Sequence, residues 1–98
     1  MSVLLAKKEY VDSKVKVVNV GNLGTGTYSY EDMKNAVSIT IIFANSDGRE
    51  DNFTFFKHPS SYAVTAAGNV VEVNFDSYFV RIVNLSDSYT FRQYIVFY

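Results

Sequence analysis

The sequence predicts an all-β fold, a compact antiparallel β-sandwich or jelly-roll-like domain preceded by a short N-terminal α-helix. Aromatic residues make up 16% of the 98-residue chain, and aromatic and β-branched side chains suit the pleated, half-buried surface of a sheet. Turn signals recur about every 8–12 residues after the opening, which is the spacing of a sandwich or small barrel. Several segments between these turns alternate apolar and polar residues, which is the period of a strand.

The length predicts one compact unit with a short leading segment. A chain of 98 residues hides roughly two-thirds of its unfolded surface in a single core. Residues 1–14 are charged and helical in character, and we expect them to serve oligomerisation or docking. Residues 15–98 carry the strand patterns, so we expect them to form the antiparallel β domain.

The first half of the β domain predicts a strand, a loop, a helical turn and a hairpin. Residues 15–20 form the first expected strand, and a glycine-rich loop follows it. Ser29 is expected to cap a single helical turn, with an acidic residue three positions later. Residues 36–44 are the clearest strand, and Asp47-Gly48 supplies the positive φ of a hairpin turn that leads into the partner strand. One face of the clearest strand carries Val37, Ile39, Ile41 and Phe43.

The second half predicts further strands, of which the last has two apolar faces. Val71, Val73 and Phe75 alternate and should point inward. In the last strand, Tyr89, Phe91, Ile95 and Phe97 are expected on one face, and Tyr94, Val96 and Tyr98 on the other. A strand with one solvated face should be polar there. Residues 95–98 therefore need cover on both sides, from a central position in the sheet or from another subunit.

The opening segment predicts contact with other copies of the chain. On a helix, Leu4, Val11 and Val15 fall at seven- and four-residue spacings, which is the a/d rhythm of a coiled coil. A helix of about ten residues is marginal alone in water, so it must dock on neighbouring copies or on its own β domain. The predicted oligomer interface comprises Leu4, Val11, Val15, Tyr94, Val96 and Tyr98.

Residues 6–15, "AKKEYVDSKV", resemble the short T-K-x-Y-V-D-x-x-V element of bacteriophage tail-fibre, head-fibre and related virion proteins. The matching positions are Lys8, Tyr10, Val11, Asp12 and Val15, while Lys7 stands where Thr is usual. The element covers about a tenth of the chain. The resemblance implies a homotrimeric virion protein, made in the host cytoplasm, whose β domain is a fibre knob, tip or decoration that contacts a host surface.

Composition argues against several classes of partner and compartment. The net charge is −1, whereas a nucleic-acid-binding domain carries a basic surplus that displaces counterions from phosphates. The chain has no cysteine, so a disulfide or a thiolate nucleophile is excluded. The opening apolar run is shorter than the ~7–15 residues of a signal-peptide core. No run approaches the ~18 residues of a membrane span, so we expect no signal peptide and no membrane insertion.

Candidate catalytic and metal-binding residues do not combine into a reaction centre. Asn45, Asp47 and Asp51 alternate as in a calcium loop, but Phe56 occupies the twelfth position, where a bidentate Glu belongs. His58 is the only histidine, and a His-cluster metal site needs several. We therefore predict a protein that is not an enzyme and that uses no metal and no cofactor.

A second reading is a free-standing β module that binds a host-surface carbohydrate or a protein. Its candidate ligand-binding residues are Tyr28, Tyr30, Arg49 and Asp51. Aromatic rings stack on the apolar faces of sugars, and carboxylates accept hydrogen bonds from hydroxyl groups. A third reading is a small phage-encoded inhibitor of a host protein. The first reading predicts a homotrimer and the second a stable monomer, so the native mass separates them.

Overall fold

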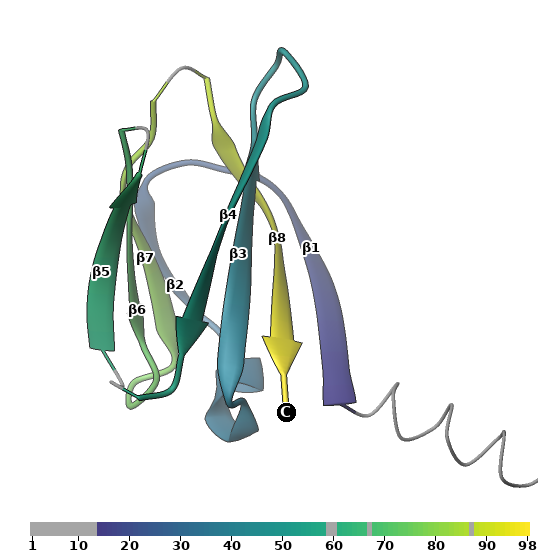
Figure 1. The fold of residues 1–98 in the computed structure, drawn as a ribbon, viewed down its shortest axis with the longest axis vertical. Helices are drawn as coiled ribbons and strands as arrows, with labels where there is room; N and C mark the ends of the chain where they lie inside the picture. The colour runs from purple at the N-terminus through teal and green to yellow at the C-terminus, as the bar shows by residue number, and fades with distance from the viewer. Residues whose placement is uncertain (1–13, 59–60, 67, 87) are drawn as a thin grey trace, which may run out of the picture.

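The computed structural model describes residues 14–58, 61–66, 68–86 and 88–98, and it shows an all-β chain with two four-stranded antiparallel sheets (Figure 1). The first sheet has the order β1 (Val15–Leu23), β8 (Thr90–Phe97), β3 (Ser38–Ala44) and β4 (Glu50–Phe56). The second has the order β2 (Gly26–Ser29), β7 (Phe79–Asn84), β6 (Asn69–Asn74) and β5 (Ser61–Ala66). The predicted helix over residues 1–14 lies outside the described residues, apart from Lys14.

The connections combine local hairpins with crossovers between the sheets. β3 and β4 form a hairpin in the first sheet, while β5, β6 and β7 form a meander in the second. The tight turn after Asn45 returns the chain directly beside β3. The outer pairs, β1 with β8 and β2 with β7, join strands far apart in the sequence.

Side chains from both sheets meet in one buried cluster. The alternation predicted for residues 36–44 is confirmed, since Ile39, Ile41 and Phe43 are fully buried. Val37 is the exception, because it precedes β3 and remains 56% exposed. The second sheet contributes Val71, Val73, Phe75, Val80 and Ile82 to the same cluster. The inward direction predicted for Val71, Val73 and Phe75 is therefore confirmed.

A bulge in β8 changes which of its side chains face the core. Ile42 of β3 pairs with Gln93, whereas the next residue, Phe43, pairs with Phe91, so Arg92 is an extra residue in the ladder. Phe91 consequently faces the core together with Tyr94 and Val96. The prediction that Phe91 shares a face with Ile95 is wrong, because simple alternation stops at the bulge. β8 lies between β1 and β3, which is one of the two forms of cover predicted for this strand.

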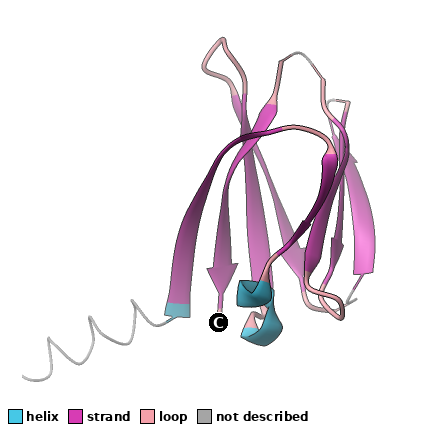
Figure 2. Cartoon of the chain, turned by 180° about the vertical axis from the view of Figure 1, so that it is seen from behind, coloured by secondary structure: helices cyan, strands magenta, loops and turns pink. Residues whose placement is uncertain are grey.

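The 3₁₀ helix η1 (Glu31–Asn35) closes the end of the molecule next to the C-terminus and the start of β1 (Figure 2). Its N-cap is Tyr30, and no side chain caps it. The predicted cap at Ser29 is wrong, because Ser29 is still in β2 and pairs with Phe79. The glycine-rich loop is also shorter than predicted, since β1 continues to Leu23 and β2 begins at Gly26.

Candidate functional site

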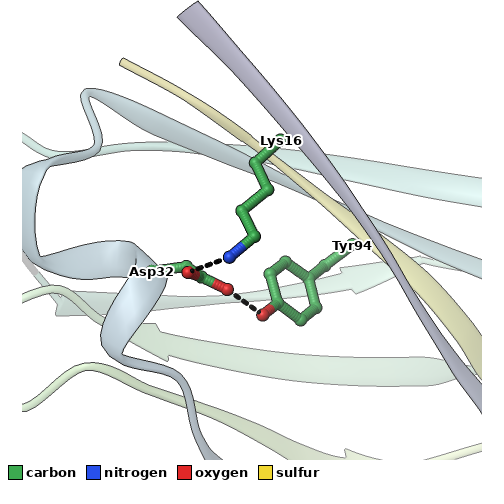
Figure 3. Close-up of polar contacts among 3 residues, drawn as sticks. All are labelled: Lys16, Asp32 and Tyr94. Atoms are coloured by element: carbon green, nitrogen blue, oxygen red, sulfur yellow. Dashed lines mark hydrogen bonds and ion pairs between the residues drawn. The ribbon is translucent and has the colours of Figure 1, made fainter. Parts of the chain in front are cut away.

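A polar cluster joins η1 to the first sheet (Figure 3). Asp32 of η1 lies between Lys16 of β1 and Tyr94 of β8. The Lys16 Nζ atom is 2.8 Å from Asp32 Oδ1, and the Tyr94 hydroxyl donates to Asp32 Oδ2 over 2.6 Å. The Tyr30 ring lies on Tyr94, with 4.3 Å between ring centroids. The Asp32 carboxylate therefore links η1 to two strands of the first sheet.

The cluster fixes the protonation states of its members. Hydrogen bonds from Lys16 and then from Tyr94 lower the pKa of the Asp32 carboxyl, and the Asp32 bond raises the pKa of Lys16. Burial is the main cause that raises the pKa of Tyr94, and the bond to Asp32 adds to it. Burial also raises the pKa of Tyr30 to about 12. At neutral pH the pair is ionised and both phenols are protonated, which suits a structural contact rather than proton transfer.

Two of the predicted ligand-binding residues, Tyr28 and Tyr30, pack against the core. The Tyr28 hydroxyl donates to the Gly24 carbonyl over 2.8 Å. Its ring centroid lies 6.1 Å from that of Phe91, across the space between the two sheets. Tyr30 stacks on Tyr94 and is also half-buried. Both rings are engaged within the chain, which reduces the aromatic surface that a sugar could contact.

The other two predicted ligand-binding residues, Arg49 and Asp51, belong to the β3–β4 hairpin. The loop of this hairpin lies at the opposite end of the molecule from η1 (Figure 1). The Asn45 side-chain oxygen accepts from the backbone N–H groups of Asp47 and Arg49, each over 3.0 Å, so it shapes the turn. The structure does not gather the four predicted residues, because Tyr30 adjoins η1 and Arg49 lies in the distant loop.

The described part of the chain shows neither a metal-binding cluster nor a membrane-spanning helix. Within it, no three or more His, Cys, Asp or Glu side chains are grouped so that they could hold a metal ion. None of the helices in the described residues is both long enough and apolar enough to cross a bilayer.

The predicted oligomer-interface residues occupy different environments. Tyr94 and Val96 are buried in the core of their own chain, so one side of β8 is covered without a partner. Tyr98 packs partly against the same core, and its N–H donates to the Lys14 carbonyl over 2.8 Å. Val15 is half-buried in β1. The remaining two, Leu4 and Val11, lie outside the described residues.

The outer face of the first sheet carries three successive rows without a charged residue. The next row, toward the β3–β4 loop, includes Glu50 and Thr90, and Arg92 donates to Thr90. We define the neutral face as three rows of residues paired directly across β1, β8, β3 and β4. The rows are Val15, Phe97, Ser38 and Phe56; Val17, Ile95, Thr40 and Thr54; and Asn19, Gln93, Ile42 and Asn52. Val17 is 54% exposed and Phe56 is 61% exposed, at the two edges of the sheet. This face was not predicted residue by residue, although the two-faced character of β8 indicated it.

The outer side of the second sheet is polar by comparison. Arg81 of β7 forms an ion pair with Glu72 of β6, with 2.6 Å between Nη2 and Oε1. Thr27 of β2 lies in the same row, directly opposite Arg81. Antiparallel sheets commonly have one face on the core and one polar face in water. The second sheet follows this rule, whereas the neutral face of the first sheet departs from it and is the best candidate for a contact surface.

Comparison with known proteins finds no family model that matches the chain, and no significant match among curated proteins or solved structures.

Proposed function

We propose that the protein is a non-enzymatic structural module of a phage virion, a β-sandwich domain that assembles as a homotrimer. It acts as a fibre knob, a fibre tip or a decoration protein and takes part in attachment to a host surface. The observation that carries the assembly is the neutral face, which leaves Val17 and Phe56 exposed to water in a single copy. The virion assignment is supported by the resemblance of residues 6–15 to the fibre-protein element.

The sandwich architecture is supported by contacts between the two sheets. Buried side chains of β3 and β8 share one cluster with those of β6 and β7. The rings of Tyr28 and Phe91 meet across the sheets, with 6.1 Å between their centroids. Two sheets that pack face to face in this way have interdigitating inner side chains and two outward faces. One of these outward faces, the neutral face, is then free for assembly.

Host contact is assigned to the loop end of the domain. The β3–β4 loop lies at the opposite end from the C-terminus (Figure 1), and Arg49 is exposed there. Loops held by a rigid scaffold are the usual carriers of binding residues. A trimer would present three copies of this loop at one end, so that weak single contacts add up through multivalency.

The test is the native mass of the full chain at micromolar concentration, measured by light scattering and native mass spectrometry. We expect a species of about three times the 11.1 kDa chain mass. A monomer that persists throughout the micromolar range contradicts the proposal and favours the free-standing binding module. Glycan arrays and pull-downs with host surface material then test attachment, with the trimer compared against a monomeric variant.

A further inference from the structure

We infer that the neutral face is the surface through which copies of this chain meet, and that it turns toward a three-fold axis. This inference rests on the proposed homotrimer and names its interface. Each copy would place its β1 edge beside the β4 edge of the next copy. The most exposed apolar side chains of the face, Val17 on β1 and Phe56 on β4, would then be covered together.

The first argument is charge. Near a symmetry axis a side chain meets copies of itself, so a charged residue there would meet like charges. None of the twelve residues of the neutral face is charged. The outer side of the second sheet carries the Arg81–Glu72 ion pair instead. The three rows of the neutral face can therefore meet copies of themselves without bringing like charges together. The nearest charges of this sheet face, Glu50 and Arg92, lie toward the β3–β4 loop.

The second argument is that four of the six polar side chains of the neutral face bond to one another in pairs. The hydroxyl oxygens of Thr40 and Thr54 are 2.9 Å apart across β3 and β4. Gln93 Nε2 donates to Asn19 Oδ1 over 2.7 Å across β8 and β1. Burial of a polar group is unfavourable when it leaves a hydrogen bond unmade. These cross-strand bonds lower that cost, so the face can be covered by an apolar surface such as itself.

The third argument is the size of the face. With strands about 4.8 Å apart and same-face residues about 6.7 Å apart, four strands by three rows cover about 19 by 20 Å, or roughly 400 Å². Each copy would bury about 400 Å² of this face in a dimer or in a trimer, and a closed trimer would bury about 1,200 Å² in total, shared among its three contacts.

The width of the face also fits a three-fold arrangement. Three faces about 19 Å wide, set as the sides of a triangle, lie about 5.5 Å from the central axis, close to half the ~10 Å spacing of packed sheets. Side chains of ordinary length would fill the interior. Ile95 of β8 and Thr40 of β3 stand in the middle of the central row, so they would lie nearest the axis.

A charge introduced at Val17 tests the assignment, and Val83 provides a matched control. Val83 is a strand valine of similar exposure, 51% against 54%, in the second sheet. Val17→Lys brings three like charges to the subunit contacts, and we expect the concentration for half-assembly to rise at least tenfold. Val83→Lys should leave it within about twofold. Urea unfolding at a dilution where both variants are monomeric shows whether each one folds.

The outcomes separate the inference from the proposed function. A wild-type trimer that tolerates Val17→Lys as well as Val83→Lys contradicts the neutral-face contact and leaves the homotrimer standing. A wild-type monomer contradicts both. A trimer lost only with Val17→Lys, in a variant that still folds, supports the inference.

A cysteine pair provides a second test that does not depend on weakening assembly. The natural chain has no cysteine, so Val17→Cys with Thr54→Cys gives the only thiols. These positions end one row of the sheet, about 14 Å apart, too far for a disulfide within one copy. Mild oxidation should give a covalent trimer on a denaturing gel. The control, Val83→Cys with Thr54→Cys, should stay monomeric, and equal yields from both pairs contradict the arrangement.

Discussion

At the scale of single residues, Asp32 links η1 to two strands of the first sheet. Its carboxylate accepts from Lys16 of β1 and from Tyr94 of β8. Lys16 lies on an edge strand on the core side of the sheet, where an inward-pointing charge also discourages further strand pairing. Sixteen positions separate Lys16 from Asp32, and 62 separate Asp32 from Tyr94. No local pattern in the sequence signals contacts over such separations.

We expect Tyr94→Phe to lower the free energy of unfolding by about 1 kcal/mol at neutral pH. The change removes the hydroxyl that donates to Asp32 and keeps the buried ring. Tyr30→Phe is the control, because that ring lies in the same stack and the described residues show no hydrogen bond from its hydroxyl. Urea titration of both variants measures the difference. A cost for Tyr30→Phe as large as that for Tyr94→Phe would mean that the Asp32 bond is not the cause.

The Asp32 contact should also make the free energy of unfolding depend on pH in the acid range. Its partners hold the pKa of Asp32 below its ordinary value of 3.8, so the fold favours the ionised form. The stabilisation is present above about pH 4 and disappears as the pH falls through the lowered pKa. We expect Asp32→Asn to cost about 1 kcal/mol at pH 7, since the pair is partly exposed, and progressively less as the pH falls below about 4. Urea midpoints of both proteins across this range measure it, and a constant difference contradicts the linkage.

Two glycines with similar positive φ angles should respond differently to substitution by alanine. Gly48 and Gly68 have φ values of +82° and +85°, but an added Cβ meets nothing near Gly48 and lies 2.9 Å from Ser86 Cβ at Gly68. Gly48→Ala should cost about 1 kcal/mol from backbone strain alone. Gly68→Ala should cost at least about 1 kcal/mol more. Thermal unfolding compares them, and Ser86→Gly in the Gly68→Ala background should recover the steric part.

At the scale of elements, the sequence predicts strands well and their irregularities poorly. The strand over residues 36–44 and its hairpin with the next strand follow from alternation and from Asp47-Gly48, and both are found. The orientation of Phe91 was predicted wrongly, because the bulge at Arg92 depends on the partner strand rather than on β8 itself. The Ser29 cap failed for a similar reason, since pairing with β7 extends β2 through that residue.

The candidate site was predicted only in outline for the same reason. Because residues 95–98 are apolar on both faces of the strand, the sequence indicated that both faces of β8 must be shielded from water. The neutral face, however, arises when Val17, Thr40 and Thr54 are aligned with Ile95 by the register of four strands. Register between strands far apart in the sequence is set by packing of the whole domain. The individual residues could not be assigned before that packing was known.

The bulge in β8 predicts unequal effects for two phenylalanines of one strand. Phe91 is fully buried, whereas Phe97 lies half-buried on the neutral face. Phe91→Ala should cost about 3–5 kcal/mol because it opens a cavity in the core, and Phe97→Ala should cost about half as much or less. Urea unfolding at a dilution where the chain is monomeric isolates the folding effect. Similar costs would place both rings on the same face, as simple alternation predicts.

At the scale of the whole molecule, the two outward faces differ in chemistry although each covers a four-stranded sheet. One carries the Arg81–Glu72 pair on its middle strands, and the other has three rows without a charge, with Glu50 in the row beyond them. The net charge of the chain is −1, so long-range repulsion between copies is small. Assembly by the neutral face should therefore be governed by apolar burial.

Salt provides a direct check on that driving force. We expect the concentration for half-assembly to change less than about twofold between low and high sodium chloride, because no ion pair forms across the neutral face. An interface made by the basic residues Lys7, Lys8, Lys14 and Lys16 with acidic groups would weaken markedly over the same range. Sedimentation equilibrium at several ionic strengths measures the effect. A tenfold loss in high salt contradicts apolar assembly.

The backbone bond from Tyr98 to Lys14 holds these two residues side by side, because the first and last described strands are adjacent in one sheet. A linker of a few glycines would be long enough to join these two residues. The domain is therefore suited to circular permutation, with new ends opened at the β3–β4 turn. It is equally suited to insertion into a surface loop of another protein, because Lys14 and Tyr98 lie side by side. The β3–β4 loop, at the other end of the domain (Figure 1), would then stay exposed.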